Sequence, residues 1–158
     1  MRGKGKKPGE TSSPLTPHPS PACELCSQPG GTLLYRNRSL RIVLVDDADY
    51  PGFCRVIWNA HVREMTDLAP AARARLMRAV FATEAAVRTV YRPHKINLAS
   101  LGNAVAHLHW HVIPRHPDDA HFPQPVWAAR QRRSVRRPAA QARARAARLA
   151  AALAHAVK

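Results

Sequence analysis

Residues 107–114 read His-Leu-His-Trp-His-Val-Ile-Pro and place three histidines at alternate positions. Successive side chains of a β-strand point to opposite faces, so this spacing puts three imidazoles on one face and Leu108, Trp110 and Val112 on the other. A helix would scatter the histidines around its axis, and the period of two therefore predicts a strand. A solvated strand with three incidental histidines is the plainer alternative. Imidazole so commonly serves as a nucleophile, proton carrier or metal ligand that we favour a functional strand.

The sequence around this strand predicts an α+β fold. Runs rich in β-branched residues are separated by short turns, so neighbouring strands are expected to pair antiparallel. The expected strands cover residues 32–36, 40–46, 53–58, 95–101 and 105–113. One long helix is expected between Ala69 and Arg92, where apolar residues recur at helical spacing. Pro70 suits its first turn and Pro93 ends it, while Pro114 is expected to close the last strand.

The 158 residues are enough for one domain with a substantial core. Residues 1–21 are basic and rich in proline, with too few large apolar side chains to offset their ordering entropy, so we expect disorder there. The globular domain is expected at residues 22–127. Residues 128–158 contain eight arginines and no acidic residue. Their alanine-rich part, 139–157, predicts a peripheral or frayed helix.

The formal net charge of +15 lies mainly in these two terminal segments. A basic tail can bind nucleic acid or an anionic surface weakly, or simply keep the protein in solution. No apolar run is long enough to span a bilayer, so no membrane association through a transmembrane helix is expected. The basic N-terminus lacks the apolar segment of a secretory signal, and we expect a cytoplasmic protein.

The order of predicted elements and the His-x-His-x-His run resemble the histidine triad (HIT) family of small nucleotide hydrolases and transferases. The matching positions are the triad with Pro114 and Arg115, residues 102–105, Asn97 and Asp46. The resemblance covers residues 23–127 and is strongest to bacterial HIT proteins labelled diadenosine tetraphosphate hydrolase-like. It implies an antiparallel sheet of about five strands, one long helix packed on that sheet, and a homodimer.

The resemblance also implies a mechanism. His109 would attack the α-phosphate of a dinucleoside polyphosphate or nucleoside phosphoramidate and carry the nucleotidyl group until water removes it. His111 would contact the phosphate oxygens or assist the leaving group, and turn amides near residues 102–104 would stabilise the charged transition state. The chain has Asn103 where the family usually has Gln and Ala104 where it has Ser. The hydroxyl that contacts the phosphate or leaving group in relatives is therefore missing.

Several polar residues are candidates for substrate binding. The expected set is Asp46, Asn97, Asn103 and His111. By resemblance, Asp46 would accept hydrogen bonds from ribose hydroxyls, although an aspartate that caps a turn is nearly as common. Asn97 would hold the triad strand or the phosphate, unless it is a plain sheet-edge residue. In the loop after the triad, His116 and His121 are expected to be solvated, while Phe122 and Trp127 could shape the pocket or a dimer contact.

Cys23 and Cys26 are two residues apart and combine with His61 and His107 into a Cys₂His₂ set, which suits a closed tetrahedral zinc site. Some bacterial HIT proteins and the related galactose-phosphate uridylyltransferases use this combination. Zinc would then tie the N-terminal loop to the catalytic strand. A pair of free thiols or a redox couple is the alternative, but no helix N-terminus is expected after the motif. Cys54 is expected in the core.

Three functions are compatible with these patterns. The first is a HIT enzyme with His109 as nucleophile. The second is a zinc-stapled nucleic-acid-binding module, although its ligands are spread from residue 23 to 107 and the basic residues lie in the tails. The third is a nucleotide sensor that kept the pocket and lost efficient catalysis, which Ala104 makes conceivable. The triad favours the enzyme.

Overall fold

The structure is a computed structural model and describes residues 22–133 and 139–157. The predicted disorder of residues 1–21 lies outside these ranges, as do Arg136 and Arg137 of the basic C-terminal segment. None of the described helices is long and apolar enough to cross a membrane.

One antiparallel sheet of five strands, in the order β1-β2-β3-β5-β4, forms the centre of the protein and confirms the predicted fold class. The strands are β1 (Thr32–Arg36), β2 (Leu40–Leu44), β3 (Cys54–Trp58), β4 (Lys95–Ala99) and β5 (His109–Arg115). β5 begins later than predicted, at His109 instead of residue 105. Because β5 lies between β3 and β4, the histidine strand is held on both sides.

β5 continues through Pro114, so the prediction that this proline closes the strand is wrong. Successive backbone groups of an antiparallel strand point alternately to its two neighbours. The Arg115 carbonyl accepts a hydrogen bond from the His94 N–H at 2.9 Å, on the β4 side, and the Pro114 nitrogen therefore faces the β3 side. The last β5 residue paired with β3 is Val112. A missing N–H at Pro114 thus breaks no ladder bond.

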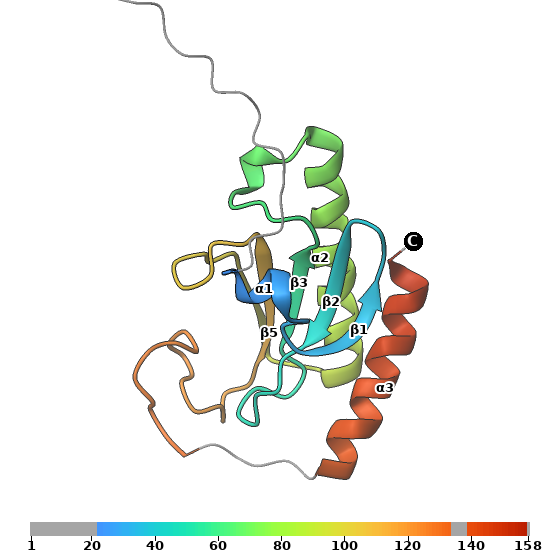
Figure 1. Cartoon of the computed structure of the whole chain (residues 1–158). Helices are drawn as coiled ribbons and strands as arrows, with labels where there is room; N and C mark the ends of the chain where they lie inside the picture. Colours follow the sequence, from blue (N-terminus) through green and yellow to red (C-terminus); the bar gives the residue numbers. More distant parts are fainter. Residues whose placement is uncertain (1–21, 134–138, 158) are drawn as a thin grey trace, which may run out of the picture.

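The helical segments of the described residues are α1 (Glu24–Ser27), the 3₁₀ helix η1 (Met65–Asp67), α2 (Pro70–Tyr91) and α3 (Ala139–Ala156). The long helix α2 covers one face of the sheet, and the short α1 lies on the other (Figure 1). α2 is the predicted long helix, with Pro70 in its first turn. It ends at Arg92, whose left-handed φ of 48° turns the chain toward β4.

α3 confirms the predicted C-terminal helix, but the expectation that it is peripheral is wrong. Leu149 and Leu153 are fully buried and Val157 is buried with them, in the same core as α2. α3 packs along α2 and β1, at the edge of the sheet (Figure 1). Two leucines four residues apart lie on one helix face, so a single apolar stripe suffices to dock an otherwise alanine-rich helix.

The two faces of the sheet carry different side chains. The face under α2 is apolar and forms the main core, with Leu40, Ile42, Val56, Leu108 and Val112. The opposite face holds smaller apolar clusters beneath α1 and the loops, including Leu25, Val43, Ile57, Phe53 and Ile113. His109 and His111 alternate with Val112 along β5 and therefore lie on this second face. The functional residues are found there.

Candidate active site and metal cluster

A cavity of about 360 Å³ opens on the second face of the sheet, and we name it the histidine cavity. Its lining residues are Glu24, Leu25, Arg55, Leu101, Asn103, Ala104, Val105, His109, His111 and Trp127. These come from α1, β3, β5, the β4–β5 connection and the loop after β5. The cavity therefore brings two of the three triad histidines together with residues distant in the sequence.

His109 is buried and its ring is fixed by a backbone carbonyl. Its Nδ1 lies 2.6 Å from the His107 carbonyl oxygen. A carbonyl can only accept a hydrogen bond, so Nδ1 carries the proton and Nε2 carries a lone pair. Nε2 lies 3.1 Å from Nε2 of His111. The neutral His109 ring thus presents the nucleophilic nitrogen beside its neighbour on the cavity side of β5.

His111 must then donate its Nε2–H toward His109, which leaves a lone pair on His111 Nδ1. That Nδ1 is buried and makes no hydrogen bond within the described residues. Burial, the neighbouring His109 and the charge of Arg55 lower the pKa of His111 to about 4. Burial also lowers the pKa of His109, despite the hydrogen bond to the His107 carbonyl, and Arg55 acts in the same direction. Both imidazoles are therefore neutral near pH 7.

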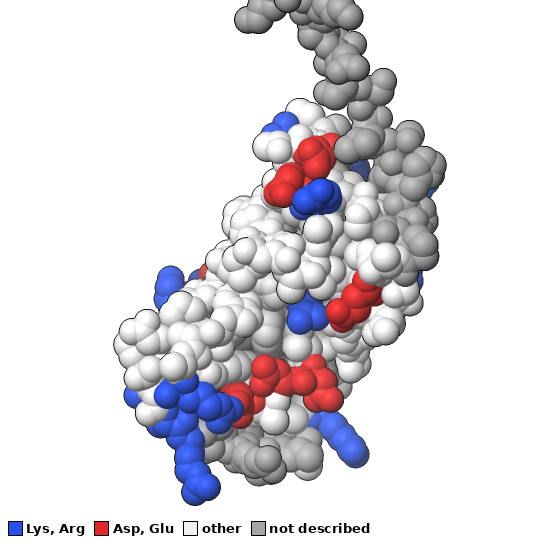
Figure 2. All heavy atoms as spheres, turned by 60° about the vertical axis from the view of Figure 1, so that its left-hand side comes forward, with Lys and Arg blue, Asp and Glu red and all other residues white. Residues whose placement is uncertain are grey.

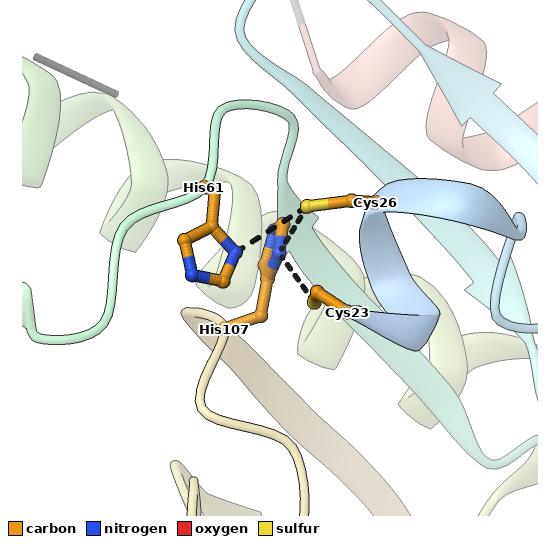
Figure 3. A group of neighbouring side chains, drawn as sticks. All are labelled: Cys23, Cys26, His61 and His107. Carbon is orange, nitrogen blue, oxygen red and sulfur yellow. Dashed lines mark hydrogen bonds between the residues drawn. The ribbon is translucent and has the colours of Figure 1, made fainter. Parts of the chain in front are cut away.

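His107 faces away from the cavity, toward the two N-terminal cysteines. Its Nε2 donates to the Trp58 carbonyl at 2.7 Å, so the lone pair lies on Nδ1. Nδ1 lies 3.5 Å from Sγ of Cys23 and 3.5 Å from Sγ of Cys26. His61 Nδ1 lies 3.3 Å from Sγ of Cys26. The four side chains converge on one point (Figure 3), and we name them the cysteine–histidine cluster.

The spacing of the cluster fits a tetrahedral metal ion. Its four ligand atoms all lie within 4.8 Å of one another. Tetrahedral zinc with ordinary zinc–sulfur and zinc–nitrogen bond lengths separates a sulfur from a nitrogen by roughly 3.6 Å, close to the three distances above. The Trp58 carbonyl fixes the ring of His107 as outer hydrogen bonds typically do for metal-ligating histidines. The cluster could therefore bind a metal ion.

A buried arginine holds the cysteine turn against the sheet. Arg41 of β2 donates to the carbonyls of Leu25 at 2.6 Å and Pro29 at 3.0 Å. Gly30 follows with a φ of +84°, and a Cβ there would lie 2.7 Å from Cδ2 of Leu25. The positive φ favours glycine at this position, because other L-residues rarely adopt it. Arg41 was not a sequence candidate, because nothing in a charged strand residue indicates that it binds backbone carbonyls.

The predicted substrate-binding residues separate into two groups. His111 and Asn103 line the histidine cavity, together with Ala104. Asp46 is exposed after β2 and is not among the described residues that line the cavity. Asn97 accepts a hydrogen bond from Nη1 of Arg115 at 2.7 Å. It thus holds the end of the triad strand, one of the two roles considered for it.

The loop after β5 is more ordered than the sequence suggested. His121 is buried and its Nδ1 forms a short hydrogen bond with the Tyr50 hydroxyl, so the expectation that it is solvated is wrong. Asp119 accepts from Arg115 Nε at 2.7 Å and from the N–H of Phe122 at 2.7 Å. Burial opposes ionisation of Asp119, but these hydrogen bonds and the Arg115 charge hold its pKa below the usual value. Phe122 packs on His94.

Two further residues line the histidine cavity: sequence reasoning missed Arg55 and left the role of Trp127 open. Trp127, at the end of the same loop, lies edge-on to His111 with ring centroids 5.2 Å apart and is 55% exposed. Arg55 lies directly opposite His111 on β3. The available signal for Arg55 was a single charge in a strand whose neighbours Cys54, Val56 and Ile57 are apolar. A single charge among apolar strand residues indicates a side chain that faces a polar site.

Comparisons with known proteins agree with this site. Residues 28–118 match the HIT domain family. The chain is 30% identical over 123 residues to a protein of Mycobacterium tuberculosis named AP-4-A phosphorylase, an alignment that covers 74% of the chain and 62% of the relative. The chain therefore spans less than two thirds of that relative.

Solved structures of histidine triad proteins superpose well on the chain. One from Marinobacter aquaeolei VT8 has a TM-score of 0.70 and 25% identity, covering 85% of this chain and 96% of that one. Another, from Sinorhizobium meliloti 1021, has a TM-score of 0.65 and 28% identity, covering 77% and 88%. Family match, relative and structures agree, and they support a nucleotide-processing function. The chain belongs to the histidine triad (HIT) family.

Proposed function

We propose that this protein cleaves nucleoside phosphoanhydrides or phosphoramidates through a covalent nucleotidyl group on His109. The observation that carries the proposal is the His109 ring, whose Nδ1 proton is held by the His107 carbonyl at 2.6 Å while the Nε2 lone pair faces the cavity side. Because burial and Arg55 lower its pKa, the nucleophilic neutral form predominates at neutral pH.

Each half of the reaction can be assigned to groups of this chain. In the first half, Nε2 of His109 forms a bond to the α-phosphorus, and the bond to the leaving oxygen or nitrogen breaks with its electron pair. The neutral His111 Nε2–H, 3.1 Å from the nucleophile, can donate to a phosphate oxygen or the leaving atom. The positive charge on the substituted His109 ring is stabilised by the His107 carbonyl. In the second half an acceptor oxygen replaces His109 and a proton is released.

The acceptor distinguishes two activities. With water the product is a nucleoside monophosphate, and the enzyme is a hydrolase, as the triad chemistry alone predicts. With inorganic phosphate the product is a nucleoside diphosphate. The relative named AP-4-A phosphorylase favours testing this second activity. We propose hydrolysis of dinucleoside polyphosphates as the leading activity and phosphorolysis as the second candidate.

We also propose that the cysteine–histidine cluster holds structural zinc. Cys23, Cys26, His61 and His107 provide the thiolate and imidazole donors that zinc prefers, at fitting separations. A closed site with four protein ligands keeps no position for substrate, so zinc would stabilise the fold without joining the reaction. Its effect on the reaction would pass through His107, whose carbonyl orients His109.

Other roles remain proposals. Asn103 would contact the phosphate from the cavity wall, and Asp46 would reach the ribose at the exposed end of β2. A homodimer and a cytoplasmic location are expected from family resemblance and sequence. Nucleic-acid binding through the basic tails is the alternative with least support. On the face shown in Figure 2 most of the surface is uncharged, and the basic side chains gather mainly at one end of it.

A single set of incubations tests the proposal. The full chain is supplied with diadenosine tetraphosphate or adenosine phosphoramidate, with and without inorganic phosphate, and the products are identified by mass spectrometry. We expect AMP without phosphate, and a protein adduct of one adenylyl group when the reaction is quenched early. ADP formed only with phosphate would establish the second activity. Activity that survives in His109→Ala would contradict the mechanism. Zinc content is measured on the same samples.

A further inference from the structure

Arg55 shares the wall of the histidine cavity with the two imidazoles. It pairs with His111 across β3 and β5. Residues directly opposite on antiparallel strands point to the same face, with Cβ atoms roughly 4.5–5.5 Å apart. Arg55, His109 and His111 all line the same cavity. A guanidinium therefore lies beside the point where a phosphate would be attacked.

Within residues 22–133 and 139–157, no carboxylate neutralises the charge of Arg55. Its Nη1 donates to the Gly30 carbonyl at 3.3 Å, while its Nε is buried without a hydrogen bond. Among the described residues no carboxylate forms an ion pair with it, although Glu24 lines the same cavity. Holding a cation in a partly buried position without an anion is costly. An anionic ligand that completes the site would offset this cost.

We propose that Arg55 binds the phosphate group next to the one that His109 attacks, and thereby selects substrates that leave as a phosphate chain. The inference rests on the proposed function. Guanidinium groups pair with phosphate oxygens through parallel, charge-assisted hydrogen bonds. Ala104 of the same cavity offers no side-chain hydrogen bond. Among the described residues that line this cavity, Arg55 is the single arginine or lysine.

The two substrate classes differ in what their leaving group needs. When a phosphoanhydride bond breaks, the electron pair stays on the leaving phosphate oxygen, and a fixed cation stabilises that charge in the transition state. When a phosphoramidate bond breaks, the leaving nitrogen takes the electron pair and a proton, and departs as an uncharged amine. Arg55 therefore favours the first class and gives the second class no comparable help.

Binding of AMP and ATP tests the contact without requiring turnover. AMP carries only the phosphate that His109 would attack, whereas ATP carries two more. Both are titrated calorimetrically in the His109→Ala background, with and without Arg55→Gln. We expect Arg55→Gln to weaken ATP binding at least about tenfold more than AMP binding, the usual effect of losing a charge-assisted pair. Equal weakening of both ligands, or no weakening, would overturn the proposal.

Turnover tests the selectivity. The measured quantity is the ratio of kcat/KM for diadenosine tetraphosphate to kcat/KM for adenosine phosphoramidate. We expect Arg55→Gln to lower this ratio about 100-fold, comparable to removing one preorganised transition-state donor. Arg55→Lys keeps the positive charge but lacks the planar guanidinium, so its kcat/KM ratio should lie between those of wild type and Arg55→Gln. A ratio within about threefold of wild type would count against selection by Arg55.

Two controls separate the possible failures. Arg78 is exposed on α2, so Arg78→Gln removes the same charge far from the histidine cavity. It should change neither the relative affinity for ATP and AMP nor the ratio of the two kcat/KM values. Unfolding midpoints and metal content show whether each Arg55 variant is folded. If His109→Ala retains turnover, the proposed function is wrong, while the comparison of AMP with ATP still decides whether Arg55 binds phosphate.

Discussion

His107 and His109 are two residues apart and lie in environments that suit different tasks. The Trp58 carbonyl accepts a hydrogen bond from Nε2–H of His107, so the Nδ1 lone pair of His107 faces two thiols. The His107 carbonyl accepts a hydrogen bond from Nδ1–H of His109, so the Nε2 lone pair of His109 lies on the cavity side. The same ring can thus serve as a metal ligand or as a nucleophile, according to which of its nitrogens donates a hydrogen bond to a backbone carbonyl.

The two regions share one hydrogen bond, between Nδ1 of His109 and the His107 carbonyl oxygen. We expect a disturbance of the cysteine–histidine cluster to reach the proposed nucleophile through this contact. His109 contributes no ligand atom to the cluster, so a change in its ring should leave metal binding intact. A variant that affected metal binding and turnover equally would contradict the assignment of separate tasks to the two regions.

The largest effect is expected for His109→Ala. Removing a covalent nucleophile typically costs at least about 10⁴-fold in kcat, because the residual rate comes only from binding and charge stabilisation. The bound metal, measured by plasma mass spectrometry, should stay at the wild-type stoichiometry. A variant that lost metal together with activity would show that the two regions are a single unit.

Cys26→Ser should abolish metal binding but lower turnover much less than His109→Ala does. Loss of one thiolate removes the metal, and we expect the free energy of unfolding to fall by at least about 3 kcal/mol, a modest part of what structural zinc supplies in small domains. Turnover should fall about 10- to 100-fold, as for disturbed outer contacts of a metal site. Urea unfolding and metal analysis measure both effects, and a chelator should reproduce them in wild type.

Cys54→Ala is the matched control for the thiol. Cys54 is fully buried in β3 but lies outside the cluster, so its loss should leave the metal in place. If Cys26→Ser kept wild-type metal content, the cluster would not be a metal site.

The pH dependence of stability should single out His111. Its pKa of about 4 in the folded protein lies below the unfolded value near 6.5, so the folded state prefers the neutral ring. The resulting stabilisation is complete above pH 6.5 and is lost as the pH falls toward 4. Between pH 7 and 5 the stability difference between wild type and His111→Gln should shrink by about 2 kcal/mol.

Urea unfolding at both pH values measures this change. Groups that do not contact His111 are common to both proteins and cancel in the difference. A difference that does not depend on pH would show that His111 is not held neutral by its surroundings.

The sequence was sufficient to predict features that depend on the order of neighbouring residues. The alternation of residues 107–113 predicted the faces of β5 correctly, because Leu108 and Val112 are in the core opposite His109. It did not place His107, which precedes β5 and faces the cysteines instead of the histidine cavity. The helix between two prolines could also be predicted, because proline suits the first turn of a helix but cannot continue one.

Features that depend on what surrounds a residue were not predictable. Pro114 could remain in a strand only because the pairing of β3 with β5 stops at Val112. Leu149 and Leu153 are buried because α2 and β1 form a surface that receives them. His121 is buried because Tyr50, distant in sequence, provides its hydrogen bond. In each case the partner is set by tertiary packing, which local sequence patterns do not show.

Trp127 offers the smallest and most specific test of the cavity side. Its ring lies edge-on to His111 and lines the cavity, but it is more than half exposed, so its contribution to stability should stay below about 1 kcal/mol. An aromatic side chain at the mouth of a nucleotide site contributes contact area that is the same in ground and transition states. We therefore expect Trp127→Ala to raise KM about fivefold, equivalent to roughly 1 kcal/mol, with kcat within about twofold. Phe81 on α2 is equally exposed, and Phe81→Ala should change neither constant. A fall in kcat without a change in KM would instead mean that Trp127 acts through the position of His111.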